Sequence, residues 1–156
     1  MRRDAAMLEW VIAESARLKA EVVSCDERES ELRRVLNFGH TIGHALEADS
    51  GYRRFLHGEA VAWGMIAATH ISAMTGRIDN NTAVRVANAV LRLGKLPKVE
   101  ARSRDIVRLL ISDKKTRDGV VHFVLPRQIG KVEIVNDVPE KTVITALNEL
   151  RRLSTS

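Results

Sequence analysis

The most apolar stretch of the chain, residues 60–74, places the strongest constraint on its fold. It is too short to cross a bilayer as a helix, and it carries the polar residues Thr69, His70 and Ser72. We therefore expect a buried core helix. Aromatic residues make up only 4% of the 156 residues and apolar residues 45%, so the core must be built from Ala, Val, Ile and Leu. Small side chains of this kind favour closely packed helices.

The rest of the chain predicts further helices and one β-hairpin. Apolar periodicity and helix end signals predict helices over residues 4–23, 29–48 with a break near Leu36–Asn37, 57–76, 80–93, a helix capped by Ser103, and 139–153. Two β-branched segments, 120–125 and 129–135, predict a hairpin that turns at Pro126–Gln128. The expected fold is mainly α, a multi-helix domain with one small β-hairpin that occupies residues 1–156 as a single domain.

Composition argues against several classes of protein. The formal charge of +5 is spread along the chain among 20 acidic residues, without an arginine-rich arm, so we expect no nucleic-acid partner. A small anionic substrate explains the excess of positive charge equally well. Neither a signal peptide nor a membrane-spanning segment is predicted. The single cysteine, Cys25, fits a reducing cytoplasm.

Three of the five histidines lie within a short region, each beside a glycine. The region contains the sequence NFGHTIGHALE at residues 37–47 and LHGEA at 56–60. Helical spacing would align four polar side chains in one stripe, namely Asn37, His40, His44 and Glu47. Gly39 and Gly43 lie one turn apart beside this stripe, where they would let another backbone or a ligand come close.

These histidines form a candidate metal site. His40 and His44 are one helical turn apart and project from the same face, and His57 could converge on that face from the start of the next helix. Zinc and similar divalent ions prefer imidazole ligands of this kind. The alternative is a pair of ordinary core histidines. We expect His70 and His122 to be core or surface residues rather than ligands. Glu59 could simply complement the dipole of its helix.

Two adjacent lysines, Lys114 and Lys115, precede a turn at Gly119. They are either part of a solvated loop or a phosphate clamp, in which lysine acts as a mobile point charge. Taken alone, Lys19 and Arg33 have the pattern of ordinary charges on a helix surface.

Several of these motifs together resemble 3-dehydroquinate synthase. The resemblance covers nearly the whole chain and is carried by Arg33–Glu47, Gly51–Tyr52, Leu56–Val61, Asp113–Lys115 and Gly119. It implies a lyase of the shikimate route to aromatic amino acids, which converts 3-deoxy-D-arabino-heptulosonate 7-phosphate to 3-dehydroquinate with NAD and a divalent metal, Zn²⁺ or Co²⁺. The implied reaction comprises transient oxidation of a hydroxyl, β-elimination of phosphate, re-reduction, ring opening and aldol closure.

The resemblance also assigns roles to individual residues. His40 and His57 match the family's two metal-binding histidines, whereas His44 matches a histidine near the phosphate that assists proton movement. This corrects the interpretation from spacing alone, in which His40 and His44 both bind the metal.

Further matches concern the substrate. Asn37 and one of Lys114 or Lys115 match residues that hold the substrate and its phosphate. Lys19 and Arg33 match basic groups that bind its hydroxyls and carboxylate.

Two parts of the family pattern are not found in this sequence. The family's third metal ligand is a glutamate from a preceding half, and the NAD site lies in a glycine-rich Rossmann-like domain there. We therefore expect this chain to correspond to the C-terminal α-helical domain of the dehydroquinate synthase-like fold, to hold metal weakly, and to contain no NAD-binding residues. Expected partners are a sugar-phosphate substrate, an N-terminal NAD-binding half and a second copy in a homodimer.

Two alternatives stay open at this point. One is a related sugar-phosphate cyclase, such as a 2-deoxy-scyllo-inosose synthase, which substrate profiling would distinguish. The other is a non-catalytic metal-binding or interaction module, for which loss of both His40 and His57 would leave any cellular phenotype unchanged.

Overall fold

The computed structural model describes residues 4–25, 31–116 and 120–155, without the side chains of residues 31–32 and 113–116. Its elements confirm the predicted fold class, with helices in nearly every predicted place and a single antiparallel strand pair in the described part. In chain order they are α1 (Ala5–Cys25), the 3₁₀ helix η1 (Glu31–Asn37), α2 (His40–Asp49), α3 (His57–Met74), α4 (Asn80–Leu91), α5 (Ser103–Thr116), β1 (Phe123–Gln128), β2 (Lys131–Val135) and α6 (Glu140–Leu153).

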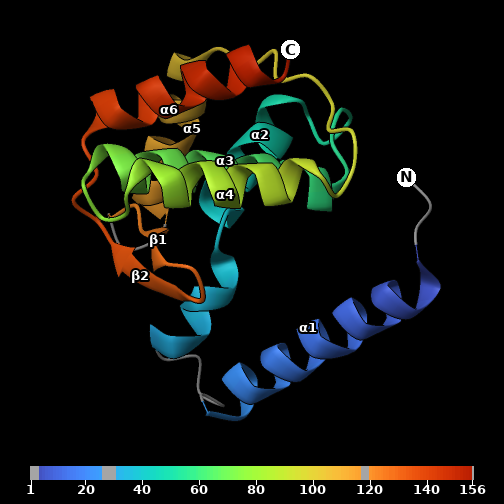
Figure 1. Ribbon diagram of the computed structural model, residues 1–156. Coiled ribbons are helices and arrows are strands. Elements are labelled where there is room, and N and C mark those ends of the chain that lie inside the picture. Colours follow the sequence, from blue (N-terminus) through green and yellow to red (C-terminus); the bar gives the residue numbers. More distant parts are fainter. Residues whose placement is uncertain (1–3, 26–30, 117–119, 156) are drawn as a thin grey trace. The chain divides into compact units, whose positions relative to one another are not determined.

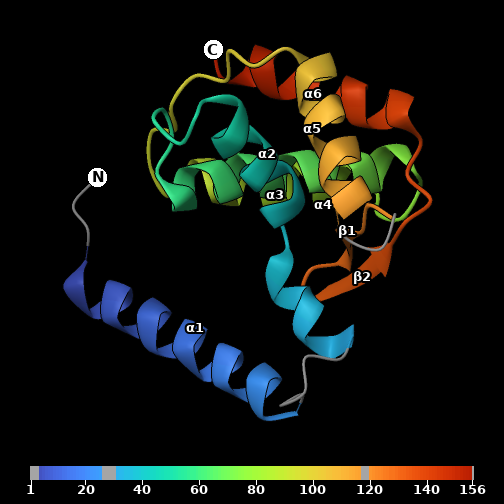
Figure 2. The ribbon, with the colours of Figure 1, turned by 180° about the vertical axis from the view of Figure 1, so that it is seen from behind.

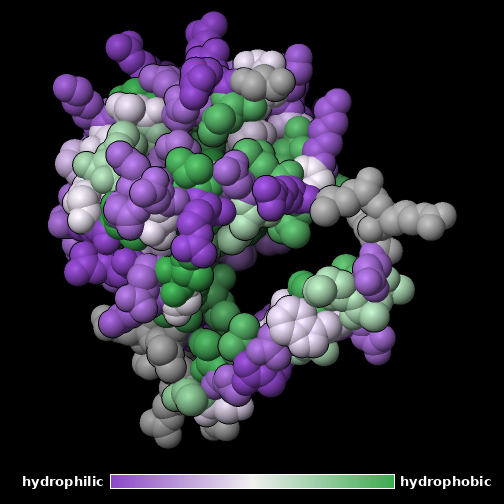
Figure 3. Space-filling model, viewed as in Figure 1, coloured by the Kyte–Doolittle hydropathy of each residue, from purple (hydrophilic) through white to green (hydrophobic). Residues whose placement is uncertain are grey.

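The chain divides into two compact units, Met1–Leu36 and Asn37–Ser156. Within the first unit, α1 has no buried residue, and its large apolar side chains Met7, Trp10 and Ile12 are exposed. Pale and green side chains alternate with purple ones along this helix in Figure 3. No described helix is both long enough and apolar enough to span a membrane.

The second unit is built around α3, which lies in its middle with α4 on one side and α2 on the other (Figures 1 and 2). It also packs against α6 and β1. As predicted, this helix is a buried core helix, with Trp63, Ile66 and Ile71 almost completely inaccessible. The indole N–H of Trp63 donates to the carbonyl of Pro97 at 2.9 Å, so the one polar atom of this large side chain is satisfied.

The predicted break after residue 36 is present, and its cause is Gly39. Gly39 has a φ of 82°, a left-handed conformation that suits glycine, and it lies at the N-terminal end of α2. The segment before it is a 3₁₀ helix rather than the predicted α-helix. Asn37 is the last residue of that 3₁₀ helix, so the α-helical spacing that placed it in one stripe with His40 is wrong.

The hairpin is confirmed, but its predicted turn at Pro126–Gln128 is wrong. Pro126 lies within β1 opposite Val132, and the chain turns at Ile129–Gly130, where Gly130 has a φ of 85°. A bulge between Pro126 and Gln128 accommodates the proline in this two-stranded sheet. The carbonyl of Pro126 accepts a hydrogen bond from the hydroxyl of Ser72, which ties β1 to the core helix.

His70 gives a prediction for the pH dependence of stability. It is half-buried on α3, and burial lowers its pKa, with Arg152 acting in the same direction and Glu149 in the opposite one. In the unfolded chain this imidazole takes up a proton near pH 6.5, whereas in the folded chain it does so only at a lower pH. The free energy of unfolding therefore decreases as the pH falls from 6.5 toward the lowered pKa. We expect His70→Gln to lose less free energy of unfolding between pH 7.5 and 5.5 than the wild type in urea titrations. Equal losses would contradict this role for His70.

Candidate metal centre

Three glycines bring α2 and α3 into backbone contact. A Cβ atom built on Gly64 of α3 would lie 1.9 Å from the carbonyl oxygen of Gly39, and one on Gly43 would lie 3.1 Å from the backbone of Ala60. The sequence predicted such an approach for Gly39 and Gly43, and the structure shows that a neighbouring helix backbone occupies the space. This contact sets the spacing between the helices that carry the histidines.

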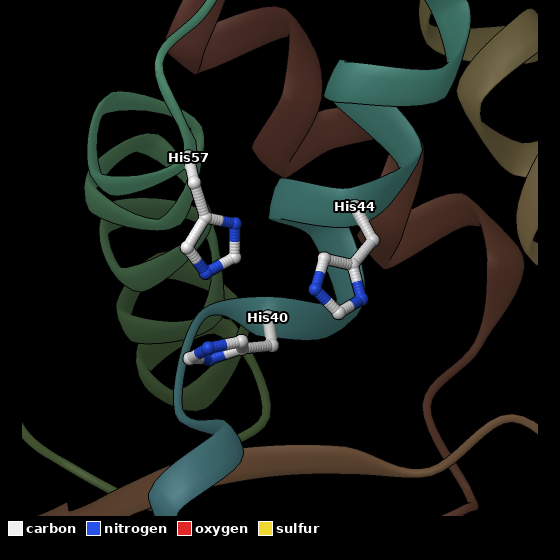
Figure 4. A group of neighbouring side chains, drawn as sticks. All are labelled: His40, His44 and His57. Carbon is white, nitrogen blue, oxygen red and sulfur yellow. The ribbon is translucent and has the colours of Figure 1, made fainter. Parts of the chain in front are cut away.

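The three histidines of the motif converge on one space, as Figure 4 shows. His40 and His44 project from the first two turns of α2, and His57 is the first residue of α3. Their ring centroids are 5.3–5.7 Å apart. One ring nitrogen from each lies within 4.8 Å of the others, and in the described part of the chain no other group of three or more histidine, cysteine or carboxylate side chains is arranged in this way.

His40 is held from behind by the backbone. Its Nδ1 lies 3.3 Å from the carbonyl oxygen of Phe38, so an Nδ1–H donated there leaves the Nε2 lone pair available. The half-buried position lowers the pKa of His40, and the nearby imidazoles of His44 and His57 contribute in the same direction. A lowered pKa favours the neutral imidazole, which is the form that binds a metal ion.

His57 has a different partner behind its ring. Its Nδ1 lies 3.3 Å from each carboxylate oxygen of Glu47 on α2. The start of α3 is fixed by Glu59, whose carboxylate accepts from the backbone N–H of Leu56 at 2.8 Å. Glu59 therefore caps the helix, and it does not belong to the group of mutually close donor atoms formed by the three histidines. The sequence did not predict the contact between Glu47 and His57. The position of Glu47 on the same helix face as His44 could have indicated it.

His44 is exposed, and its ring nitrogens make no hydrogen bond to any described residue. His40 and His57 thus each have an oxygen behind Nδ1, as histidines that bind metals usually do, whereas His44 does not. The surroundings of His44 therefore differ from those of His40 and His57.

The donor set fits a divalent transition-metal ion. Three nitrogen donors suit zinc, which takes imidazole nitrogens at about 2.0–2.1 Å in a tetrahedral arrangement and leaves a position open in catalytic sites. Ligands at that distance lie within about 4 Å of one another. The observed spacing of up to 4.8 Å is wider than this, so the side chains would move closer together to bind an ion.

The other predicted site residues lie on several elements. Asn37 is exposed at the end of η1, Lys19 is exposed on α1, and Arg33 is half-buried in η1. Lys114 and Lys115 belong to α5, but their side chains lie outside the described residues. His70 is half-buried on α3 and His122 is exposed just before β1.

The chain is similar to known proteins over nearly its whole length. The family model described as 3-dehydroquinate synthase C-terminal matches residues 1–116. The 3-dehydroquinate synthase of Koribacter versatilis (strain Ellin345) is 53% identical over 154 residues, which are 99% of this chain and 42% of that protein. The enzyme of Solibacter usitatus (strain Ellin6076) is 47% identical over 148 residues, 94% of this chain and 42% of its own length. The chain thus spans about two fifths of the length of these curated relatives.

Solved structures show the same fold. The 2-epi-5-epi-valiolone synthase from Streptomyces hygroscopicus subsp. jinggangensis 5008, with NAD⁺ and Zn²⁺ bound, superposes with a TM-score of 0.77 at 30% identity, covering 97% of this chain and 42% of that one. A 2-deoxy-scyllo-inosose synthase complexed with carbaglucose-6-phosphate, NAD⁺ and Co²⁺ gives 0.73 at 25% identity, covering 92% and 41%. From the match of the family model over residues 1–116 and the identity to its curated relatives, the chain belongs to the 3-dehydroquinate synthase C-terminal family.

Proposed function

We propose that this chain supplies the metal- and substrate-binding part of a 3-dehydroquinate synthase. The proposed enzyme converts 3-deoxy-D-arabino-heptulosonate 7-phosphate to 3-dehydroquinate and phosphate. The observation that carries the proposal is the convergence of His40, His44 and His57, two of them with an oxygen behind Nδ1. The high identity to relatives named 3-dehydroquinate synthase supports this reaction.

His40 and His57 are the proposed metal ligands, each through Nε2. A bound divalent ion supplies Lewis acidity, which polarises the substrate hydroxyl undergoing oxidation. One of the two solved cyclases contains Zn²⁺ and the other Co²⁺, which supports either ion as the cofactor. Both also contain NAD⁺, for which we propose a site in a preceding domain, with a glutamate from that domain as the third ligand.

His44 is the proposed proton carrier. It is exposed beside the two ligand histidines, so it can reach a bound substrate, and the loss of phosphate requires a proton to leave carbon and a proton to reach the departing group. Its ring is not committed to a described oxygen partner as the rings of His40 and His57 are.

Substrate binding is proposed for basic and amide side chains around this site. Asn37 and one of Lys114 or Lys115 would hold the phosphate end, and Lys19 and Arg33 the hydroxyls and carboxylate. The net charge of +5 suits a substrate that carries both a phosphate and a carboxylate. We also propose a cytoplasmic enzyme that acts as a homodimer, and the exposed apolar side chains of α1 support self-association.

A related sugar-phosphate cyclase is the second candidate. The two similar solved structures are a 2-epi-5-epi-valiolone synthase and a 2-deoxy-scyllo-inosose synthase, not 3-dehydroquinate synthases. The 3-dehydroquinate synthase reading is preferred because its curated relatives are 53% and 47% identical.

Release of phosphate tests the proposal. We suggest replacing the equivalent C-terminal part of the Koribacter versatilis enzyme with this chain, which is 53% identical to it over 154 residues. With NAD⁺ and Zn²⁺, we expect phosphate release from 3-deoxy-D-arabino-heptulosonate 7-phosphate and none from glucose 6-phosphate. His44→Ala should lower kcat about 100-fold or more while zinc stays bound. Release only from glucose 6-phosphate would favour the related cyclase, and release from neither substrate would favour a non-catalytic module.

A further inference from the structure

We propose that Glu47 is a positioning residue that fixes the ring of His57 for metal binding. In this arrangement the carboxylate accepts the Nδ1–H of His57, so that Nε2 carries the lone pair offered to the ion. The inference rests on the proposed metal role of His57. It goes beyond that role because it assigns the orientation and the tautomer of the ring to a residue that is not itself a ligand.

The contact is made by a buried carboxylate and an exposed ring. The side chain of Glu47 is 10% exposed, whereas that of His57 is 57% exposed. Burying a carboxylate is costly unless a donor compensates it. Nδ1 of His57 lies 3.3 Å from both oxygens of Glu47, and it can act as that donor when it carries the proton. An exposed imidazole at the first position of a helix would otherwise turn freely toward solvent.

The backbone on both sides of the contact is fixed. The carbonyl of Glu47 accepts from the N–H of Tyr52 at 2.8 Å and from the hydroxyl of Ser50 at 2.9 Å, which secures the end of α2. On the other side, Glu59 caps the start of α3 beside His57. The Glu47–His57 pair therefore joins two rigid helix ends, and the ring is oriented relative to α2, which also carries His40.

Glu47 does not itself belong to the ligand cluster. Among the described residues, the group of mutually close donor atoms consists of His40, His44 and His57, and Glu47 does not belong to it. In Figure 4 the ring nitrogen of His57 nearer its own chain points toward α2, and the far nitrogen points toward His40. A carboxylate behind a ligating histidine fixes its tautomer and raises its basicity, and its loss typically weakens metal affinity 10–100-fold.

The tautomer is measurable without any metal. In ¹H–¹⁵N spectra of the metal-free chain at pH 8, we expect His57 in the Nδ1–H form in the wild type. In Glu47→Ala the proton should move largely to Nε2, the form that free imidazole side chains favour in water. Glu59→Gln is the matched control, because it changes a neighbouring carboxylate that contacts Leu56 and not the ring. The same tautomer in wild type and Glu47→Ala would overturn the proposal.

Zinc affinity gives the second readout. Competition with a chromophoric chelator should show 10–100-fold weaker binding for Glu47→Ala and a smaller loss for the isosteric Glu47→Gln, with Glu59→Gln unchanged. If Glu47→Ala does not fold, Glu47→Gln decides the question. Wild-type affinity in Glu47→Ala, or a loss in Glu47→Gln as complete as in His57→Ala, would overturn the proposal, the latter because Glu47 would then be a ligand. Failure of the proposed function is distinguishable, since it would leave the metal-free tautomer unchanged.

Discussion

Replacing Gly64 with alanine is expected to force α2 and α3 apart and to abolish zinc binding. The new Cβ would lie 1.9 Å from the carbonyl oxygen of Gly39 and 2.9 Å from the amide nitrogen of Gly43, and both neighbours are backbone atoms that no side-chain rotation can move away. Overpacking of this kind typically costs 1–3 kcal/mol and occasionally more, and we expect about 3 kcal/mol or more here. Urea unfolding and a zinc titration measure the two effects.

Gly58 provides the matched control for this substitution. It lies in the same helix, and a Cβ built on it meets no atom within 4 Å. Gly58→Ala should therefore be neutral or slightly stabilising, since alanine favours a helix by up to about 1 kcal/mol over glycine. If Gly64→Ala were as stable as Gly58→Ala and bound zinc equally well, the backbone contact would not set the geometry of the site.

Removing either proposed ligand is expected to have the second large effect. His40→Ala and His57→Ala should each weaken zinc binding by more than about 100-fold, because the loss of a residue behind a ligand already costs 10–100-fold. His44→Ala should weaken it less than about tenfold, since its ring lacks the oxygen partner that the other two have in the described structure. A competition titration with a chromophoric chelator measures all three.

His122→Ala is the control, because this exposed histidine lies outside the cluster. A loss in His44→Ala equal to that in His40→Ala would contradict the division of roles. It would restore the reading based on helical spacing, in which both histidines of α2 bind the metal.

Local signals were enough to predict much of the fold and of the site. The apolar run of residues 60–74 predicted a core helix, and α3 is one. The helix predicted over residues 80–93 is α4, whose N-terminus is capped by Asp79, accepting from the N–H of Thr82 at 2.8 Å. The approach of His57 to His40 and His44 was also predictable. His40 and His44 are one helical turn apart and project from the same face of α2, so a third ligand could converge only on that face.

Features that depend on how elements pack were not predictable in this way. The Glu47–His57 contact requires the angle between α2 and α3, which local sequence does not specify. The need for glycine at position 64 arises only from the backbone of Gly39 on the neighbouring element, which the local sequence does not reveal. The hairpin turn was misplaced because proline signals a turn locally, whereas a bulge accommodates Pro126 in β1 and Gly130 makes the turn.

Diffraction at the zinc absorption edge from crystals of the zinc-loaded chain tests the central claim most directly. We expect one anomalous peak at about 2.0–2.1 Å from Nε2 of His40 and Nε2 of His57. Nδ1 of His57 should face Glu47, and His44 should not coordinate the ion. A peak bonded to His44 in place of His57, or one located away from these three residues, would contradict it.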